Sequence, residues 1–333
     1  MSAGAPVAAV DCGTNSVRLL VTRGETDLLR RMEIVRLGQD VDRTGRLDPA
    51  AIARTRVVLE SYAADITRLG AAAVRMVATS ATRDASNRAE FVAMVRQVLG
   101  VSPEVVSGQQ EAALSYAGAT AGLSQRTRWP VLVVDIGGGS TEFAWGPGPG
   151  AVGGAYSADI GCVRLTERFL HSDPPTRMQR DAAEEHVRAA LDAAFDGAAL
   201  DRAGPLGTLV GLAGSVTTVA AYVLDLPGYD ADRIHGTRLP ASDVQAAAAE
   251  LLAMSRAQRA ALPFMHPGRA DVIGGGALVL AAVLTRTGLD AVTVSEHDIL
   301  DGIAASLLPG PTRGPEPRVA ESELPVPDPY LEA

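Results

Sequence analysis

One arrangement of residues occurs twice in this chain of 333 residues. Val7 to Asp11 is an apolar run that ends in a carboxylate, and Cys12-Gly13-Thr14-Asn15-Ser16 follows it. Val131 to Asp135 is a second such run, followed by Ile136-Gly137-Gly138-Gly139-Ser140. Each copy predicts a strand, a turn of small residues and a returning strand. Such a turn favours anion binding, because consecutive backbone N–H groups without Cβ atoms around them form a nest for phosphate oxygens.

The side chains at the two turns extend this chemistry. Asp11 and Asp135 would repel a phosphate directly, so we expect them to hold a divalent cation, Mg²⁺, that bridges carboxylate and phosphate. The hydroxyls of Ser140 and Thr141 are expected to join the backbone of residues 137–139 in binding phosphate. An ordinary Asp-Gly turn explains either hairpin alone. Two copies favour two related lobes that face each other across a cleft.

The chain must therefore build two lobes, and its length also predicts two domains. Strands and helices alternate, which is typical of an α/β protein. We expect a first lobe over residues 1–124 and a second over 125–308. The final helix, at about 297–308, is expected to pack back on the first lobe. The Pro-, Gly- and Glu-rich residues 309–333 are expected to form a disordered tail.

Apolar periodicity places further elements around the two hairpins. We expect a strand near 28–36, a helix over 48–69, a buried strand over 73–79 and a polar turn at 80–85. A helix over 108–122 is predicted to begin with Gln109-Gln110-Glu111. In the second lobe, a strand at 206–212 is expected to lead into Ala213-Gly214-Ser215 and a helix. Gly214 and Ser215 are expected to bind the phosphate from the side opposite the glycine turn.

Composition excludes several classes of chemistry. The 30 basic residues are all arginine, and a chain without lysine has no Walker A motif, pyridoxal Schiff base or lysine nucleophile. Cys12 and Cys162 have no partner spacing and are expected to be buried as small apolar residues. The five histidines are scattered, so we expect no zinc site.

The overall charge and hydropathy limit the kinds of partner that we expect. The net charge is -9, and no basic stripe with interleaved aromatic residues appears, so we expect no nucleic-acid surface. No apolar run reaches the roughly 18 residues of a membrane span, and no basic segment precedes the first strand. These features predict a cytoplasmic protein without a membrane partner.

Five motifs together carry a resemblance to a known family. They are Asp11 to Ser16, Thr79-Ser80-Ala81-Thr82-Arg83, Ser107-Gly108-Gln109-Gln110-Glu111-Ala112, Asp135 to Glu142, and Gly211-Leu212-Ala213-Gly214-Ser215. With these motifs in this order, the chain resembles the exopolyphosphatase and guanosine pentaphosphate phosphohydrolase family, within the actin-like, sugar-kinase-like ATPase superfamily. The resemblance covers residues 7 to about 302.

The resemblance implies a fold and a set of roles. The fold would be two ribonuclease-H-like domains flanking an interdomain cleft. The activity would be cleavage of terminal phosphate from polyphosphate by water with Mg²⁺. The family's catalytic glutamate falls on Glu111, its second essential glutamate on Glu142, and its phosphate-contacting asparagine and arginine on Asn15 and Arg83. A homodimer is a further expectation. The chain lacks the helical C-terminal region of longer members, which favours short or medium polyphosphate chains.

General chemistry agrees with these roles. Hydrolysis of a phosphoanhydride requires a carboxylate that orients and deprotonates the attacking water, which suits Glu111 at a helix start, and a cation such as Arg83 over the equatorial oxygens. Glu142 shares the strand face of Ser140, so it would orient metal or water at the turn. A dipole-complementing Glu111 and a surface Arg83 are the structural alternatives.

Four functions remain open at this stage. The first is an exopolyphosphatase, and the second is a guanosine pentaphosphate phosphohydrolase using the same residues. The third is a phosphotransferase of the same superfamily, although no general base for an acceptor is evident. The fourth is a non-catalytic regulator that binds guanosine penta- or tetraphosphate. Gly274 to Ala277 is explained equally by an adenosine site and by close helix packing.

Overall fold

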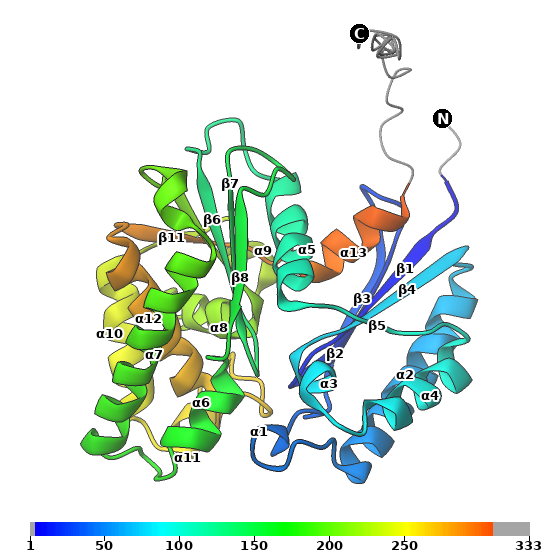
Figure 1. The fold of residues 1–333 in the computed structure, drawn as a ribbon, viewed down its shortest axis with the longest axis horizontal. Helices are drawn as coiled ribbons and strands as arrows, with labels where there is room; N and C mark the ends of the chain where they lie inside the picture. Colours follow the sequence, from blue (N-terminus) through cyan, green and yellow to red (C-terminus); the bar gives the residue numbers. More distant parts are fainter. Residues whose placement is uncertain (1–3, 309–333) are drawn as a thin grey trace, which may run out of the picture.

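The computed structural model describes residues 4–308, which form two β-sheets with helices on both faces (Figure 1). The first sheet contains β1 (Val7–Cys12), β2 (Ser16–Thr22), β3 (Asp27–Ile34), β4 (Ala73–Ala78) and β5 (Glu104–Val105). The second contains β6 (Val131–Ile136), β7 (Thr141–Gly146), β8 (Gly154–Ala158), β9 (Thr208–Leu212), β10 (Arg238–Pro240) and β11 (Ala291–Val294).

The two sheets share one topology. The strand order is β3-β2-β1-β4-β5 in the first and β10-β11-β9-β6-β7-β8 in the second. β1 pairs antiparallel with β2 and parallel with β4, and β6 pairs in the same way with β7 and β9. The second sheet therefore repeats the first and adds β10 at its edge. This confirms the expected pair of related α/β lobes.

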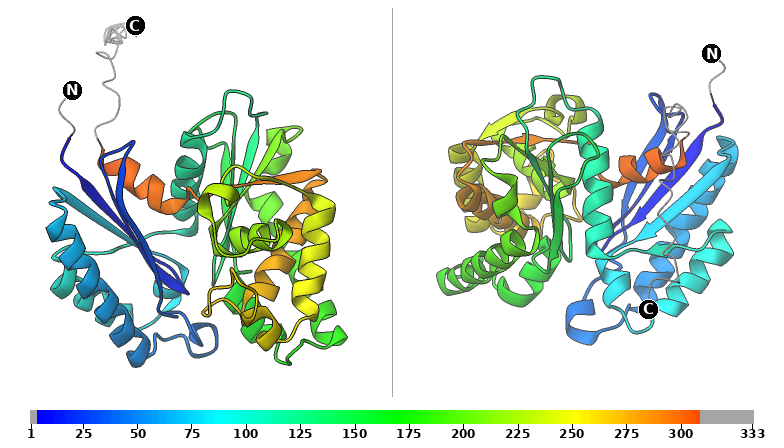
Figure 2. Two further views of the ribbon diagram at one scale, coloured as in Figure 1. Left: turned by 180° about the vertical axis from the view of Figure 1, so that it is seen from behind. Right: turned by 45° about the horizontal axis from the view of Figure 1, so that its top comes forward.

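Helices connect and cover the sheets (Figures 1 and 2). Those before the second hairpin are α1 (Val41–Thr44), α2 (Pro49–Arg68), α3 (Ser80–Asp84), α4 (Arg88–Leu99) and α5 (Gly108–Ala121). Those after it are α6 (Cys162–Phe169), α7 (Arg177–Gly197), a 3-10 turn (Leu200–Ala203), α8 (Ala213–Val223), α9 (Ala231–Ile234), α10 (Ala241–Ala253), α11 (Arg256–Ala260), α12 (Ile273–Thr287) and α13 (Ile299–Leu307).

Local sequence signals explain where several of the helices begin and end. The Asp48 side chain accepts the Ala50 N–H at the start of α2, where Pro49 takes the first helical position. Ser107 and Gln110 form a capping box at the start of α5. Gly100 ends α4 in the left-handed conformation.

Helix α5 precedes the second sheet but packs on it, and helix α13 follows the second sheet but packs on the first. α13 covers one face of the first sheet, where Ile299 and Ile303 pack with Ala9 and Val77, while α2 and α4 cover the other face. α5 precedes the second hairpin, yet its buried residues pack with β6, β7 and β9. The boundary drawn near residue 124 from the sequence thus separates α5 from the sheet on which it lies.

The crossing of α5 and α13 joins the lobes at close range. A Cβ atom on Gly118 would lie 1.9 Å from the Asp298 carbonyl oxygen, and one on Gly302 would lie 2.1 Å from the Leu114 carbonyl oxygen. Only glycine at these two positions allows the helix backbones to approach so closely.

Three local expectations differ from the structure. Residues 80–85, expected as a polar turn, form the short helix α3, because Ala81 and Ala85 are buried in the first core. β3 ends at Ile34, since the N–H groups of the next two residues bond to Asn15. β8, with the weak strand formers Gly154 and Ala155, was not expected. The tail at 309–333 lies outside the described residues.

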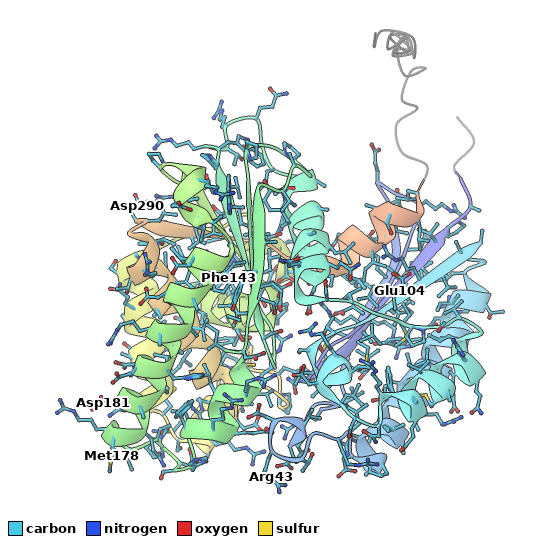
Figure 3. All side chains as sticks on the ribbon, in the orientation of Figure 1. Arg43, Glu104, Phe143, Met178, Asp181 and Asp290 are labelled. Carbon is cyan, nitrogen blue, oxygen red and sulfur yellow. The ribbon has the colours of Figure 1, made fainter. Side chains whose placement is uncertain are left out.

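The cores are built as the composition predicts, from aliphatic side chains with few aromatic ones. Phe143 lies inside the second lobe (Figure 3), and Cys12 and Cys162 are buried and free, which confirms the expectation for both. No helix within residues 4–308 combines the length and apolar character needed to cross a membrane.

Candidate active site

The first turn presents its N–H groups to the cleft because its carbonyl groups are occupied from behind. The Gly13 N–H bonds to the Ser16 carbonyl at 2.9 Å and closes the hairpin. The Asn15 carbonyl accepts the N–H groups of Val35 and Arg36, and the Thr14 carbonyl accepts that of Gly38 at 2.8 Å. The turn is therefore held from its carbonyl side, which leaves the N–H groups of Thr14 and Asn15 for an anion.

The second turn is held in the same way by the start of α6. The Gly137 carbonyl accepts the Cys162 N–H at 2.9 Å, and the Gly138 carbonyl accepts the Val163 N–H at 2.8 Å. Gly161 lies so close that a Cβ atom there would be 2.2 Å from the Gly138 oxygen. Among residues 4–308, the N–H groups of residues 138–140 donate to no protein acceptor. They form the backbone nest that the glycines predict.

A third set of backbone donors lies at the start of α8. Ala213 has a φ of 67°, and this left-handed residue turns the chain from β9 into the helix. Gly214 and Ser215 occupy the first turn of α8, where N–H groups have no partner within the helix. The helix dipole adds to the attraction for an anion at this end.

All three sets border one cavity of about 100 Å³ between the lobes. Its lining includes Asp11, Gly13, Thr14, Asn15, Arg18, Thr79, Ser80 and Glu111 from before the second hairpin, and Asp135, Gly137, Gly138, Ser140, Glu142, Gly214, Ser215 and Arg269 from after it. The structure thus brings together most of the residues singled out from the sequence.

Three predicted residues are not in this lining. Thr141 is fully buried and its hydroxyl donates to the Ile160 carbonyl at 2.9 Å, because side chains alternate along β7 and Glu142 takes the cavity side. Its predicted phosphate contact is corrected accordingly. Gly139 is pressed against the opposite lobe, where a Cβ atom would lie 2.7 Å from the Ser80 hydroxyl oxygen. Arg83 reaches the site through Glu111.

Glu111 combines burial with one cationic partner. Arg83 Nη1 donates to Glu111 Oε2 at 3.1 Å and to the Val106 carbonyl at 3.1 Å. The Glu111 side chain is buried in the first turn of α5. Burial, and then the charge of Glu142, raise the pKa of Glu111 well above its ordinary range, although Arg83 opposes them.

Glu142 is held from the neighbouring strand. Ser157 Oγ on β8 donates to Glu142 Oε1 at 2.7 Å. Burial, and then the charge of Asp135, raise the pKa of Glu142 to about 8. Two buried carboxyl groups with raised pKa values on one cavity are typical of acid–base sites.

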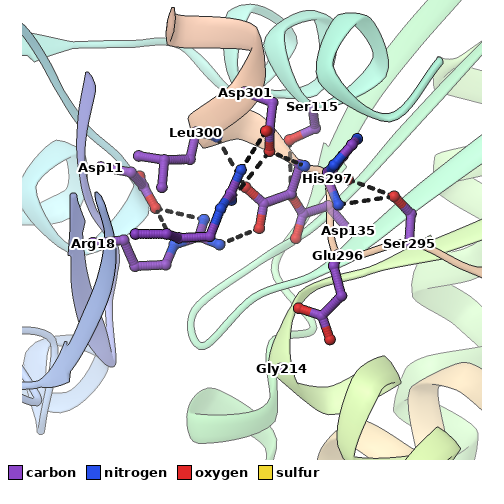
Figure 4. Close-up of polar contacts among 12 residues, drawn as sticks. Asp11, Arg18, Ser115, Asp135, Gly214, Ser295, Glu296, His297, Leu300 and Asp301 are labelled. Carbon is purple, nitrogen blue, oxygen red and sulfur yellow. Dashed lines mark hydrogen bonds and ion pairs between the residues drawn. The ribbon is translucent and has the colours of Figure 1, made fainter. Parts of the chain in front are cut away.

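Asp11 is paired with an arginine that sequence reasoning did not single out. Arg18 Nη2 bonds to Asp11 Oδ2 at 2.7 Å (Figure 4). Arg18 Nη1 forms an ion pair with Asp298. Asp298 also accepts the Leu300 N–H and caps α13. The pKa of Asp11 is raised by burial, which outweighs the opposing charge of Arg18. Arg18 thus joins β2 to the start of α13 at the cavity wall.

Asp135 faces the same region from the second lobe, where Ser115 Oγ donates to its Oδ2 at 2.7 Å (Figure 4). Burial, and then the charge of Asp298, raise the pKa of Asp135 to about 6. Asp11 Oδ1 is buried without a hydrogen-bond partner, and such an orphaned oxygen fits a cation. No group of three or more His, Cys, Asp or Glu side chains within residues 4–308 is arranged to hold a metal. The donors therefore fit a Mg²⁺ that takes one or two carboxylates and completes its shell with phosphate and water.

Arg18 and Arg269 are the charged residues of the cavity lining that sequence reasoning missed. Arg18 lies opposite Asp11 in the β1–β2 register, so an arginine inside a buried strand was the available signal. Arg269 packs its guanidinium against Gly214, where a Cβ atom would lie 2.2 Å from its Cζ. Arg269 belongs to none of the five motifs, and it is the fold that brings it to the cavity.

Comparisons with known proteins agree with this architecture. The chain is 51% identical over 318 residues to Exopolyphosphatase 2 of Mycobacterium tuberculosis, covering 90% of this chain and 98% of that protein. A solved exopolyphosphatase-like protein superposes with a TM-score of 0.87 at 42% identity, covering 91% of this chain and 98% of that one. The Aquifex aeolicus member of the Ppx/GppA family superposes with a TM-score of 0.76 at 31% identity, covering 91% and 97%. The family model described as the Ppx/GppA phosphatase family matches residues 20–310, and the chain belongs to this family.

Proposed function

We propose that the protein is a Mg²⁺-dependent exopolyphosphatase that releases terminal orthophosphate from short or medium chains of inorganic polyphosphate. The observation that carries the proposal is the position of Glu111 on the same small cavity as two phosphate-binding turns and the start of α8. The relationship to Exopolyphosphatase 2 supports the substrate class.

Glu111 is the proposed general base. It accepts the proton of the attacking water while the oxygen of that water approaches the terminal phosphorus in line with the leaving oxygen. The raised pKa of Glu111 suits this role, because a base is most effective when its pKa lies near the working pH. Arg83 holds the Glu111 carboxylate through one hydrogen bond and adds positive charge beside the developing oxyanion.

The terminal phosphate is proposed to bind between the two turns. The N–H groups of Gly138 and Ser140 and the Ser140 hydroxyl approach it from one side, Asn15 from the facing turn, and Gly214 and Ser215 from α8. These donors are fixed before substrate arrives, so little reorganisation opposes the reaction.

Glu142 and the aspartates are proposed to manage charge around the phosphate. With a pKa of about 8, Glu142 holds a proton over much of the neutral range and can donate a hydrogen bond to a phosphate oxygen. Asp11 and Asp135, or Glu142 when it is ionised, would hold a Mg²⁺, which would supply charge neutralisation for the phosphate oxygens.

A neighbouring cavity favours guanosine pentaphosphate as a second candidate substrate. This cavity of about 370 Å³ shares Arg18, Gly214 and Arg269 with the first and is also lined by Tyr229 and Phe264. Aromatic faces beside arginines are suited to a nucleobase and its phosphates. The same reaction at Glu111 would then release the terminal γ-phosphate of the nucleotide.

Replacing the Glu111 carboxylate with an amide tests whether Glu111 is the base. We expect Glu111→Gln to lower orthophosphate release from tripolyphosphate by roughly 10² to 10⁴-fold, because a general base contributes on this scale. Glu104→Gln is the matched control, since Glu104 lies exposed shortly before α5 and pairs with Arg75, away from the cavity. An undiminished rate in Glu111→Gln would remove the proposed mechanism.

Competition assays separate the two substrates. Orthophosphate release from polyphosphates of 3 to ~100 units is compared with release from guanosine pentaphosphate at equal terminal phosphate concentration. A higher kcat/KM for polyphosphate supports the first candidate, and the reverse supports the second. We also propose that the enzyme works in the cytoplasm as a homodimer, in line with the resemblance described above, and sedimentation of the purified chain tests the dimer.

A further inference from the structure

A buried arginine lies where the two lobes meet, at the end of the cleft away from the α5–α13 crossing. Arg164 is in the first turn of α6 and is 9% exposed. Helices α1 and α3 of the first lobe lie beside α6 at this end of the cleft (Figure 1). None of the reaction roles proposed above uses Arg164.

One nitrogen of Arg164 contacts the glycine turn. Arg164 Nε donates to the Gly139 carbonyl at 2.7 Å, and the Gly161 N–H reaches the same oxygen at 3.3 Å. This bond holds the Gly139 oxygen toward α6. The peptide group that carries this oxygen also carries the N–H of Ser140, which points the opposite way because the peptide is planar and trans. Arg164 therefore sets the direction of one of the proposed phosphate donors.

The other two nitrogens contact the opposite lobe. Arg164 Nη1 forms an ion pair with Asp42 of α1, and Nη2 bonds to Asp84 Oδ2 of α3 at 2.8 Å. Asp159, in the same lobe as Arg164, lies farther away at 3.5 Å and is largely exposed. Hydrogen bonding from Arg168 is the main cause that lowers the pKa of Asp42, and the charge of Arg164 adds to it. Asp42 is therefore ionised at neutral pH.

The rigidity of the guanidinium connects these contacts. Its donors form a planar fork of fixed geometry, so the nitrogens cannot move independently. A displacement of Asp42 and Asp84 relative to α6 pulls on the same plane that holds the Gly139 carbonyl. A lysine has a single nitrogen on a flexible stem and cannot satisfy both sides in this way.

We propose that Arg164 is a positioning residue that couples contact between the lobes to the anion-binding geometry of the turn at residues 137–140. Asp42 and Asp84 of the first lobe fix the guanidinium, and the guanidinium fixes the Gly139 peptide. The phosphate nest of the second lobe is then complete only when the first lobe is in place. This inference rests on the proposed phosphate site, and it adds a requirement that neither turn carries by itself.

A purely structural ion pair would predict a different pattern, and the chain offers a matched control. Arg168 lies four residues later on the same helix and also binds Asp42, but it does not contact the glycine turn. If Arg164 acts only by joining the lobes, replacing Arg168 should have a similar effect on phosphate binding. If Arg164 acts through Gly139, replacing Arg168 should have little effect.

The test measures binding of inorganic phosphate, which cannot turn over, by titration calorimetry of the full chain with Mg²⁺. We expect Arg164→Lys to weaken phosphate binding by about tenfold or more and to raise KM for tripolyphosphate by more than it lowers kcat. Arg168→Lys and Asp159→Asn should each change phosphate binding by less than about twofold. Equal binding in Arg164→Lys and wild type, or an equal loss in Arg168→Lys, would overturn the inference.

Asp84→Asn keeps the assay decisive if Arg164→Lys does not fold. This change leaves the Gly139 contact intact and removes charge only from the opposite lobe. We expect it to weaken phosphate binding in the same direction by itself. Where Arg164→Lys does fold, the effect of Asp84→Asn should largely disappear in that background. Additive losses would contradict the coupling. A wild-type protein that binds no phosphate at all would overturn the proposed phosphate site itself, whereas wild-type binding retained in these variants overturns only the coupling.

Discussion

Glu111 and Glu142 border one cavity and differ in what surrounds them. Glu111 has the guanidinium of Arg83 as a partner, whereas Glu142 accepts a hydrogen bond from the neutral Ser157 and faces the charge of Asp135. Burial raises both pKa values, but only Glu111 has an adjacent arginine bond to oppose it. We infer that Glu111 acts as the base because its bond to Arg83 orients the carboxylate at the cavity, whereas Glu142 is held by Ser157 and has no arginine bond.

Protonation of Glu142 should be visible in the stability of the protein. Its folded pKa of about 8 lies above the ordinary value of 4.5, so between these pH values the folded state holds a proton that the unfolded state has released. The free energy of unfolding therefore falls as pH rises through this window, by roughly a few kcal/mol in total. We expect Glu142→Gln to flatten this dependence and to raise the thermal midpoint near pH 8, measured in metal-free buffer from pH 5 to 8.

The control for this measurement is Glu184→Gln on the exposed face of α7. It should leave the slope of stability against pH as it is in the wild type. A Glu142→Gln variant with the wild-type slope would contradict the raised pKa. Activity offers an independent check, because loss of the Glu142 charge should shift the acid limb of the pH–rate profile to lower pH by relieving repulsion on Glu111.

At the scale of elements, the phosphate turn is made by α6 as much as by its own glycines. Backbone N–H groups at the start of α6 take up the carbonyl groups of residues 137 and 138, so the donors of the turn face the cleft. N–H groups within residues 35–38 bond to the carbonyl groups of the first turn in the same way. Without such a segment behind it, a glycine-rich hairpin could turn its carbonyl groups toward the anion. Their partial negative charge would then repel the anion.

Gly161 is the point at which this arrangement is most sensitive. Its φ is -80°, so alanine suits the backbone, but a Cβ atom would lie 2.2 Å from the Gly138 oxygen. We expect Gly161→Ala to displace the turn and to weaken inorganic phosphate binding by at least about tenfold, measured by calorimetry. Gly148→Ala is the control, since no atom lies within 4 Å of its added Cβ. Equal phosphate affinity in both variants would show that α6 does not shape the turn.

At the scale of the whole molecule, the two lobes are joined by an exchange of helices. α5 packs on the second sheet and α13 on the first, and the two helices cross at Gly118 and Gly302. Glu111 lies in the first turn of α5, and Asp298, which pairs with the cavity residue Arg18, caps α13, so this crossing places both carboxylates. The exchange commits the site to a defined relation between the lobes.

Crowding the crossing should destabilise the lobes together. Gly302→Ala places a Cβ atom 2.1 Å from the Leu114 carbonyl oxygen, and overpacking of this kind costs about 1–3 kcal/mol. Alanine also favours the helix by up to ~1 kcal/mol, so we expect a net fall of several degrees in Tm within one cooperative transition. Gly228→Ala, with open space around it, should keep the wild-type Tm. Two separated transitions in Gly302→Ala would argue that the crossing does not couple the lobes.

Much of the fold and site follows from local sequence, and the exceptions have clear physical causes. The repeated hairpin predicts two sheets of the same topology, and the capping residues of α2 and α5 mark their ends. Thr141 was assigned to the phosphate although strand alternation turns it away from Glu142. The helix at residues 80–84 was missed because its order depends on contacts with the first core rather than on its own polar residues.

The sequence by itself determined the two phosphate-binding turns, the order of the elements and the carboxylates at the turns. These features depend on backbone freedom, on the spacing of apolar residues and on residue type over a few positions. The expected packing of the last helix on the first lobe is confirmed by α13. Only the tertiary structure decided that α5 packs on the second sheet, that Arg18 pairs Asp11 with Asp298, and that Arg164 connects Gly139 to the opposite lobe. Such contacts join residues far apart in the chain. They depend on how two packed lobes meet, and no local pattern in the sequence encodes that geometry.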